Sequence, residues 1–252
     1  MLLIDTDFLA YKSAQACEEG IDFGNDVIVA QSRFSEVLKI FERELKKVKT
    51  AMMDDEVILY FSSPKNFRKE ISADYKGHRN RRKPLGYKRL VNHCIDNYRT
   101  VVRDNLEADD SLGIDVTGRC FANITSSFPN EDFIIVSPDK DMKQIPGILW
   151  NMSDDVEEIT KEDGDRWHLM QTLAGDPTDG YPGCPGIGMK RAGDLLDKSD
   201  NHWKAICQAF KDKGLSEDIA LMNARLAKIL QDENYDYDRE APILWTPVLQ
   251  QG

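Results

Sequence analysis

The chain has 252 residues, of which 41% are hydrophobic, and its 44 acidic and 33 basic residues give a formal net charge of −11. This length and apolar content favour one large α/β domain, or a domain with a small appendage, around a sizeable core. The sequence has no apolar run long enough to cross a bilayer, no signal peptide and only scattered cysteines. These features argue against a membrane or disulfide-stabilised secreted protein, so we expect a cytoplasmic location.

The first part of the chain predicts two strands that flank a helix. Residues 2–5 and 57–61 are short apolar runs typical of strands. Between them, residues 26–49 carry apolar side chains at helical spacing. This spacing predicts one long amphipathic helix that packs on the core.

The segment after the second strand is strongly basic. Residues 65–89 contain ten Lys or Arg and two acids, a net charge of +8, which leaves −19 on the rest of the chain. The segment has few apolar residues, so we expect an exposed, mobile and partly helical excursion over a site. Its cations could grip phosphates without reading sequence, and Tyr75 could stack on a base of a frayed end. A solvated basic surface loop is the alternative.

Alternating elements continue through the middle of the chain. The sequence predicts a helix at residues 85–96, a strand at 100–103, a helix from Glu107 towards Phe121, and strands at 133–136, 148–152 and 156–159. Strands that alternate with helices favour an α/β fold with a mostly parallel sheet and right-handed crossovers.

Acidic residues gather near the ends of these strands. Nine carboxylates form four clusters: Asp5 and Asp7; Glu107, Asp109 and Asp110; Asp139 and Asp141; Asp176 and Asp179. Sites in open parallel sheets lie beyond the carboxyl ends of the strands, so we expect these clusters to converge. Crowded carboxylates repel and bind cations, and oxygen ligands favour Mg²⁺ or Mn²⁺, which predicts a two-metal phosphodiester-cleaving site. Alone, the acids that open the helix at Glu107 could simply be partners of the helix dipole.

From residue 161 the pattern is helical to the end. A loop rich in Gly and Pro, residues 175–188, precedes a helix at 189–196, and further helices are predicted at 203–210 and 216–230. Backbone N–H groups near Gly186 and Gly188 could hold a phosphate at this helix start.

Together these motifs resemble the 5′→3′ exonuclease and flap-endonuclease family, and most closely its short bacteriophage members. The basic segment resembles the family's arch, through Phe67-Arg68-Lys69-Glu70, Tyr75-Lys76, Arg79, Lys83-Pro84 and Gly86-Tyr87. Leu106-Glu107-Ala108-Asp109-Asp110 and Asp139-Lys140-Asp141 resemble its two central acid motifs. The segment from Gly175-Asp176 to Gly186-Ile187-Gly188 resembles its helix–three-turn–helix DNA-binding element. The motifs occur in the right order over nearly the whole chain.

The resemblance implies a PIN-like, three-layer flap-nuclease domain at residues 1–160, with the arch at 64–90. A helical DNA-binding region would follow at 161–252, with the helix–three-turn–helix at about 165–200. The implied activity is that of a 5′→3′ exonuclease on duplex DNA, with flap-endonuclease and RNase H-like activity that leaves 5′-phosphates. The implied partners are double-stranded DNA with 5′ ends or flaps and RNA–DNA hybrids, for a monomer that acts in DNA replication in the host-cell cytoplasm without a membrane.

The resemblance also implies roles for single residues. Two Mg²⁺ ions, which Mn²⁺ could replace, would be held by Asp5, Glu107, Asp109 and Asp110 at one site and by Asp139, Asp141, Asp176 and Asp179 at the other. Lys76 and Arg79 would reach the scissile phosphate, and a K⁺ could sit at the loop near Gly186. The DNA-binding residues would be Arg68, Lys69, Tyr75, Arg81, Arg82, Lys83, Gly186, Gly188, Lys190 and Arg191.

One position departs from the family pattern. Ser63 follows the second strand where family members commonly place an Asp, so the first metal would bind more weakly, bind through water, or use Asp7 instead. This departure leaves room for a DNA-binding protein that has lost catalysis. A haloacid-dehalogenase-type phosphatase, whose Asp-x-Asp motif Asp5 and Asp7 match, is a second alternative, but it leaves the basic segment unexplained.

Overall fold

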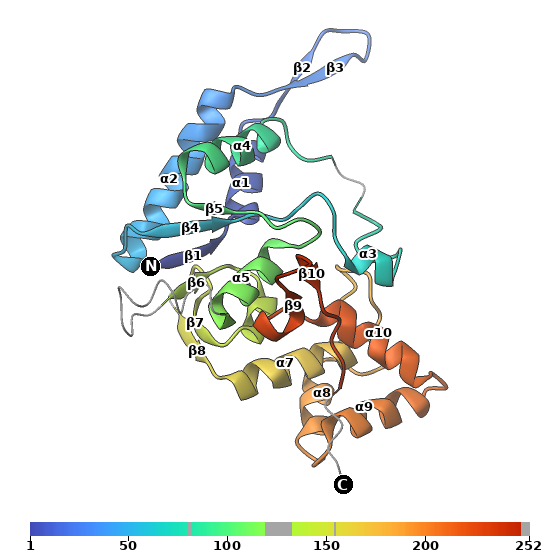
Figure 1. Cartoon of the computed structure of the whole chain (residues 1–252). Helices are drawn as coiled ribbons and strands as arrows, with labels where there is room; N and C mark the ends of the chain where they lie inside the picture. The colour runs from blue at the N-terminus through green and yellow to red at the C-terminus, as the bar shows by residue number, and fades with distance from the viewer. Residues whose placement is uncertain (80–81, 119–132, 154, 248–252) are drawn as a thin grey trace.

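The computed structural model describes residues 1–79, 82–118, 133–153 and 155–247, and the fold is built on a six-stranded sheet (Figure 1). The strand order is β5-β4-β1-β6-β7-β8, and all neighbours are parallel except β8, which runs antiparallel to β7. The strands span Leu2–Asp5 (β1), Val57–Tyr60 (β4), Thr100–Val101 (β5), Ile134–Val136 (β6), Gly147–Trp150 (β7) and Val156–Ile159 (β8). The prediction of a mostly parallel α/β sheet is confirmed.

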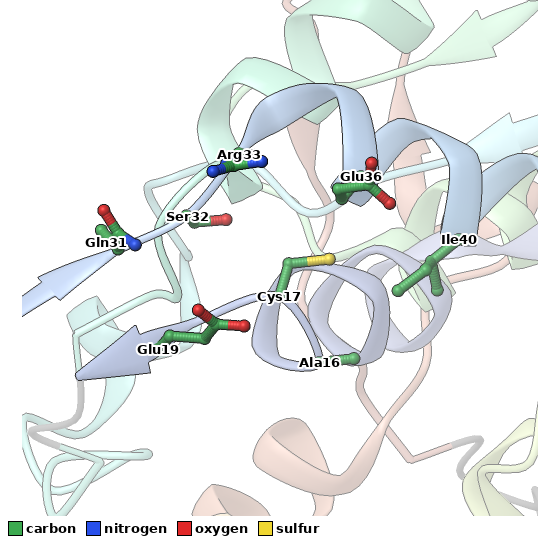
Figure 2. Close-up of a pocket in the computed structure, with 8 residues that line it drawn as sticks. All are labelled: Ala16, Cys17, Glu19, Gln31, Ser32, Arg33, Glu36 and Ile40. Carbon is green, nitrogen blue, oxygen red and sulfur yellow. The ribbon is translucent and has the colours of Figure 1, made fainter. Parts of the chain in front are cut away.

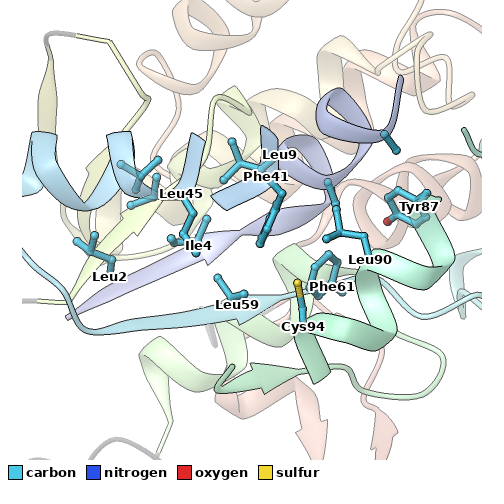
Figure 3. Packing of buried hydrophobic residues seen from close by; sticks show 14 of the residues in the cluster. Leu2, Ile4, Leu9, Phe41, Leu45, Leu59, Phe61, Tyr87, Leu90 and Cys94 are labelled. Atoms are coloured by element: carbon cyan, nitrogen blue, oxygen red, sulfur yellow. The ribbon is translucent and has the colours of Figure 1, made fainter. Parts of the chain in front are cut away.

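Helices cover both faces of the sheet, because successive side chains of a strand point to opposite faces. Leu2 and Ile4 of β1 pack in the cluster that faces helices α1 (Thr6–Gln15), α2 (Phe34–Met52) and α4 (Tyr87–Asn97) (Figure 3). Leu3 lies in the opposite cluster, which includes residues of α5 (Ala108–Thr117) and of the short 3-10 helix η1 (Lys140–Gln144). This arrangement is the three-layer architecture implied by the resemblance.

The chain after β8 forms four helices with a core of their own. They are α7 (Lys161–Ala174), α8 (Met189–Leu196), α9 (His202–Lys211) and α10 (Glu217–Ala227). Leu173, Ile206 and Phe210 are fully buried among them. Gly175 and Gly183 have positive φ, and a Cβ at Gly175 would lie 2.4 Å from the Pro182 carbonyl carbon, so the Gly/Pro-rich loop requires glycine where these two residues approach each other.

The expectation of helix to the end of the chain is wrong beyond Ala227. Lys228 has extended backbone, and the chain continues into a 3-10 turn, η2 (Asp232–Asn234), and two short antiparallel strands, β9 (Tyr235–Asp236) and β10 (Ala241–Pro242). The helix ends because backbone groups of this segment bond to Arg68 and Asp110 instead of to the next helical turn.

A hairpin replaces the first part of the helix predicted at residues 26–49. Strand β2 (Glu19–Asp22) pairs antiparallel with β3 (Ile28–Gln31), and α2 begins only at Phe34. Asn25 and Asp26 make the turn with φ of 54° and 61°, a conformation that Asn and Asp tolerate well. The β-branched residues that follow favour a strand, and the hairpin extends away from the helices (Figure 1).

The other predicted elements are present with shifted bounds. The strand expected at 100–103 has two residues, and the helix that follows Glu107 ends at Thr117. Phe121, towards which this helix was predicted to extend, lies outside the described residues. Within the described part of the chain, no helix is both long enough and apolar enough to cross a membrane.

Candidate metal centre and nucleic-acid interface

A cavity of about 450 Å³ opens beyond the carboxyl ends of β1, β4 and β6. Asp5 ends β1, Ser62 and Ser63 follow β4, and Asp139 lies just after β6. The carboxylates that line the cavity are Asp5, Asp7, Glu107, Asp109 and Asp139, and the cations are Lys69, Lys76, Arg79 and Lys83. Acids from distant parts of the sequence therefore converge at one sheet edge, as predicted.

Two carboxylates of this region have pKa values that are raised to near neutral pH. Burial, followed by the charge of Asp7, raises the pKa of Asp5 to about 7, although the Ser137 hydroxyl donates a hydrogen bond of 3.0 Å to it. Burial and the charge of Asp139 likewise raise the pKa of Asp141 to about 7. A divalent ion stabilises the charged form of carboxylates that burial and mutual repulsion keep from ionising. The donor set is made of oxygens, so the residues fit hard divalent metals.

Glu107 lies where the acids meet the basic segment. It caps α5 and exchanges hydrogen bonds with Asp110 in a capping box. Its carboxylate accepts bonds from Lys76 Nζ at 2.5 Å and from the Tyr75 hydroxyl at 2.8 Å. Burial opposes its ionisation, but the charges of Lys76 and Arg68 outweigh burial and lower the pKa of Glu107 to about 2. Glu107, Asp109 and Asp110 each offer an oxygen within 4.8 Å of the others.

The second predicted ligand group borders the first. Asp139 caps η1 by accepting from the Asp141 N–H at 2.9 Å, and the Asp141 carboxylate interacts with the charges of Asp139, Asp176 and Asp179. Asp176 accepts the Thr178 N–H at 2.7 Å. The loop of residues 175–188 thus brings its two acids against the acids of the sheet edge.

The two predicted catalytic cations reach this region from the basic segment. Both line the cavity, where Lys76 pairs with Glu107 and lies 3.5 Å from an Asp179 oxygen. Arg79 donates to Asp179 at 2.7 Å and to the Thr178 carbonyl at 3.1 Å. Their positive charges therefore face the carboxylates directly.

The prediction of an exposed basic segment is wrong at the base of this segment. Arg68, in the short helix α3 (Arg68–Ile71), and Tyr75 are each 2% exposed. Tyr75 donates from its hydroxyl to Glu107 and Asp179, so it is not free to stack on a base, and Arg68 does not reach solvent to contact DNA. Aromatic rings and a fully paired guanidinium can pack as core even in a segment of high net charge.

The remaining cations of the segment lie nearer the surface. Lys69 and Lys83 line the cavity, and the Lys83 ammonium lies 4.3 Å from the centre of the Tyr87 ring. Arg82 pairs with Glu18 at the root of the hairpin at 2.5 Å. Arg81, also predicted to bind DNA, lies outside the described residues.

The predicted phosphate-binding loop lies at the start of α8. Gly188 caps the helix, and a Cβ added at Gly186 or Gly188 would meet no atom within 4 Å. Lys190 and Arg191 are not buried, and Arg191 donates to the Gly186 carbonyl at 2.8 Å. Open backbone next to exposed cations is suited to a polyanion, and DNA binding here remains a prediction.

Several side chains that support the acids were not predicted. Ser137 bonds Asp5, Gln171 of α7 donates to Asp141 at 2.6 Å, and Tyr87 donates to Asp7. The Ser62 N–H also donates to Asp7 at 3.1 Å. Ser137 follows a strand directly and could have been found from that position, whereas nothing in the sequence around Gln171 indicated its role.

A second cavity, of about 470 Å³, lies at the root of the hairpin (Figure 2). Cys17, Glu19, Arg33 and Glu36 contribute to its lining, and none of the predicted site residues does. Burial, with added effects of Glu36 and Glu19, raises the pKa of the Cys17 thiol. The thiol is therefore held in its unreactive protonated form, and this cavity takes no part in the candidate site.

Comparison with known proteins agrees with the geometry, although no family model matches the chain. An exodeoxyribonuclease of Enterobacteria phage T3 is 27% identical, and an exonuclease of Escherichia phage T7 is 26% identical, each over 98% of this chain and 93% of its own length. A solved flap endonuclease of bacteriophage T5, in complex with DNA and metal ions, shares the fold with a TM-score of 0.62 and 15% identity, over 90% of this chain and 88% of its own. In sequence and in fold, the chain resembles the 5′→3′ exonuclease and flap-endonuclease family.

Proposed function

We propose that this protein is a metal-dependent 5′→3′ exonuclease that hydrolyses phosphodiesters of duplex DNA and leaves 5′-phosphates. The observation that carries the proposal is the cavity in which Asp5, Glu107, Asp109 and Asp139 face Lys76 and other cations. The names of the phage relatives support the activity. Cleavage of flaps and of the RNA strand in RNA–DNA hybrids, by a monomer, belongs to the same proposal.

The proposed cofactors are two Mg²⁺ ions, for which Mn²⁺ could substitute. When bound, such a pair activates a water and stabilises the leaving oxygen as a Lewis acid. Asp5, Glu107 and Asp109 would hold one ion, and Asp139, Asp141, Asp176 and Asp179 the other. Because the carboxylates are needed as ligands, none of them acts as the general base. A K⁺ at the loop near Gly186 is a further part of the proposal.

We propose that Lys76 and Arg79 neutralise charge on the scissile phosphate, a role that their place in the cavity lining supports. Both now pair with acids of the site, and a bound phosphate would compete for them with Glu107 and Asp179. Each would offset negative charge that grows in the transition state.

Asp7 is a candidate to replace the acid that Ser63 lacks. The Asp7 carboxylate lies against the end of β4, where it accepts the Ser62 N–H, and it lines the cavity. The Ser63 hydroxyl accepts the Asn105 N–H at 3.2 Å. Asp7 therefore supplies a negative charge close to the position where the family commonly has Asp, and we propose that it supports the first metal.

The test is digestion of 5′-labelled blunt duplex, flap and RNA–DNA hybrid substrates with Mg²⁺. Asp139→Asn should abolish 5′-mononucleotide release, whereas the exposed Asp55→Asn, which removes a charge far from the cavity, should cleave at the wild-type rate. Equal rates for Asp139→Asn and wild type would reject the proposal. Salt-dependent DNA binding without cleavage by wild type would instead indicate a DNA-binding protein that has lost catalysis.

A further inference from the structure

Arg68 lies at the junction of three segments that are distant in sequence. A guanidinium has five N–H donors. All five of Arg68 have acceptors: the Leu226 carbonyl at 3.0 Å, Glu107 at 3.3 Å, the two Asp110 oxygens at 2.7 and 2.8 Å, and the Lys228 carbonyl at 2.5 Å. No donor is left for a phosphate. The base of the arch, the start of α5 and the chain that leaves α10 are therefore joined by one side chain.

Asp110 is equally saturated. It is fully buried, and its two oxygens accept bonds from Arg68, from the Leu230 N–H at 3.0 Å and from the Glu107 N–H at 3.2 Å. A carboxylate has about four acceptor sites, and these contacts occupy all of them. Asp110 lies near Glu107 and Asp109 but has no lone pair free for a metal.

The pair fixes the parts of the site that do face the cavity. Asp110 and Glu107 form the capping box of α5, which sets the backbone of its first turn. Arg68 and Tyr75 both donate to Oε2 of Glu107, which restricts the rotation of that carboxylate. Asp109 lies in the same turn, so its direction into the cavity depends on this arrangement.

We infer that Arg68 and Asp110 are positioning residues of the metal centre, which hold Glu107 and Asp109 in place and link them to the segment after α10. Neither residue contacts the metal or DNA. This inference rests on the proposed function, in which Glu107 and Asp109 hold a divalent ion. It reassigns two residues that the family resemblance places among the DNA contacts and the metal ligands.

The decisive measurement is Mn²⁺ binding to the protein without DNA. If Arg68 positions the ligands, Arg68→Met weakens Mn²⁺ binding by about tenfold or more, as loss of a supporting partner usually does. If Asp110 is instead a ligand masked by Arg68, removal of the guanidinium frees a carboxylate and removes a positive charge, so Mn²⁺ binds more tightly. The two outcomes have opposite signs, and tighter binding overturns the inference.

Lys65→Met is the matched control. Lys65 lies three residues before Arg68, carries the same charge, is exposed and does not line the cavity. Its removal should leave Mn²⁺ binding equal or slightly tighter. If the control weakens Mn²⁺ binding as much as Arg68→Met does, loss of any cation of the basic segment has this effect. That result would overturn the positioning role of Arg68.

A second variant guards against unfolding. Arg68→Met alone leaves the Asp110 charge buried without its partner, which is strongly destabilising. Arg68→Met combined with Asp110→Leu removes both charges and should fold. The double variant should still bind Mn²⁺ about tenfold more weakly than wild type, because the capping box is lost. Wild-type affinity in the folded double variant would disprove the inference.

Kinetics separate positioning from DNA contact. The double variant should lower kcat with KM for duplex DNA within about threefold of wild type, and higher Mn²⁺ should restore part of kcat. A raised KM with a weaker salt dependence and an unchanged kcat would identify Arg68 as a phosphate contact and reject the inference. Mn²⁺ binding is measured without substrate, so a wild-type protein that fails to cleave DNA would refute the proposed function while the metal-binding series still decides the positioning role.

Discussion

The two ends of α5 carry acids in opposite circumstances. Asp115, near its end, is paired: Arg103 donates to one oxygen and the Tyr60 hydroxyl donates to the other at 3.0 Å. Asp109, in its first turn, faces the cavity, and burial with the charges of Asp110 and Glu107 raises its pKa well above the usual range. Compensated acids stabilise the fold, whereas the uncompensated ones destabilise the metal-free protein. Of these two acids, Asp109 is therefore the one to assign to a metal.

The largest expected effect is on catalysis. Asp109→Asn keeps the shape of the side chain but removes a proposed ligand, so cleavage with Mg²⁺ should fall by about a thousandfold or more. In EDTA the free energy of unfolding of the same variant should be about 1–2 kcal/mol higher than that of wild type, because a charge that burial disfavours is gone. Initial rates and urea unfolding measure the two effects. If Asp109→Asn were less stable than wild type in EDTA, the contrast between Asp109 and Asp115 would be contradicted.

The opposite pattern is expected at the other end of α5. Arg103→Met removes the cation from Asp115 and should lower the free energy of unfolding by about 3 kcal/mol, because a buried charge loses its partner. Cleavage per folded molecule should stay within about twofold of wild type, because Arg103 does not line the cavity. Urea unfolding compares this variant with the exposed Arg99→Met. Equal stability of the two would show that the Asp115 pair adds nothing.

The pH dependence of stability sharpens the same contrast. The pKa values of Asp5 and Asp141 are about 7 in the folded protein and about 4 when unfolded, so the folded state binds more protons between these values. Their contribution to stability is therefore full below about pH 4 and is lost as pH rises through 7. The sum is on the order of a few kcal/mol in the metal-free protein.

His168 acts in the other direction. Burial and the charge of Lys228 lower the pKa of His168 to about 3, so its contribution is present above its unfolded pKa of 6.5 and is lost as pH falls. Saturating Mg²⁺ should remove the loss of stability that Asp5 and Asp141 cause as pH rises. The contribution of His168 should then make stability rise with pH between about 4 and 6.5. Urea unfolding at several pH values, with Mg²⁺ and with EDTA, measures the two slopes. Identical slopes would mean that no ion binds these acids.

The smallest effect is expected at the exposed Arg82–Glu18 pair. Glu18→Gln removes a carboxylate that accepts from Arg82 and from the Leu85 N–H. Exposed pairs contribute little to stability, so Tm should not change measurably. DNA affinity at low salt should rise slightly, because Arg82 is no longer neutralised. Gel shifts at two salt concentrations test this expectation, and weaker binding would show that the pair orders the segment for DNA.

Local patterns predicted much of this fold because they depend on neighbouring residues. The apolar runs of β1, β4 and β6, and the acids at the ends of β1 and β6, place Asp5 and Asp139 at one edge without knowledge of the rest. The hairpin at β2 and β3 was missed because Val27 falls at helical spacing from residues of α2. Its turn depends on the backbone of Asn25 and Asp26, which periodicity does not reveal.

Partners across the fold could not be predicted in the same way. The burial of Arg68 depends on carbonyls at Leu226 and Lys228, about 160 residues away in the chain. A cation in a basic segment is predicted to be solvent-exposed as long as such distant acceptors are unknown. The contact of Gln171 with Asp141 is similar, since it depends on how α7 packs against η1.

The shared packing at the base of the arch limits how modular the protein is. Tyr75 is buried in one cluster with Tyr181 and Leu226, and the Lys76 N–H donates to the Asp179 carbonyl at 2.7 Å. A fragment cut at residue 160 would therefore expose aromatic surface and leave Arg68 without two of its hydrogen-bond acceptors. Chimaeras that exchange the C-terminal helices with those of a relative would have to carry matching residues at positions 68 and 75.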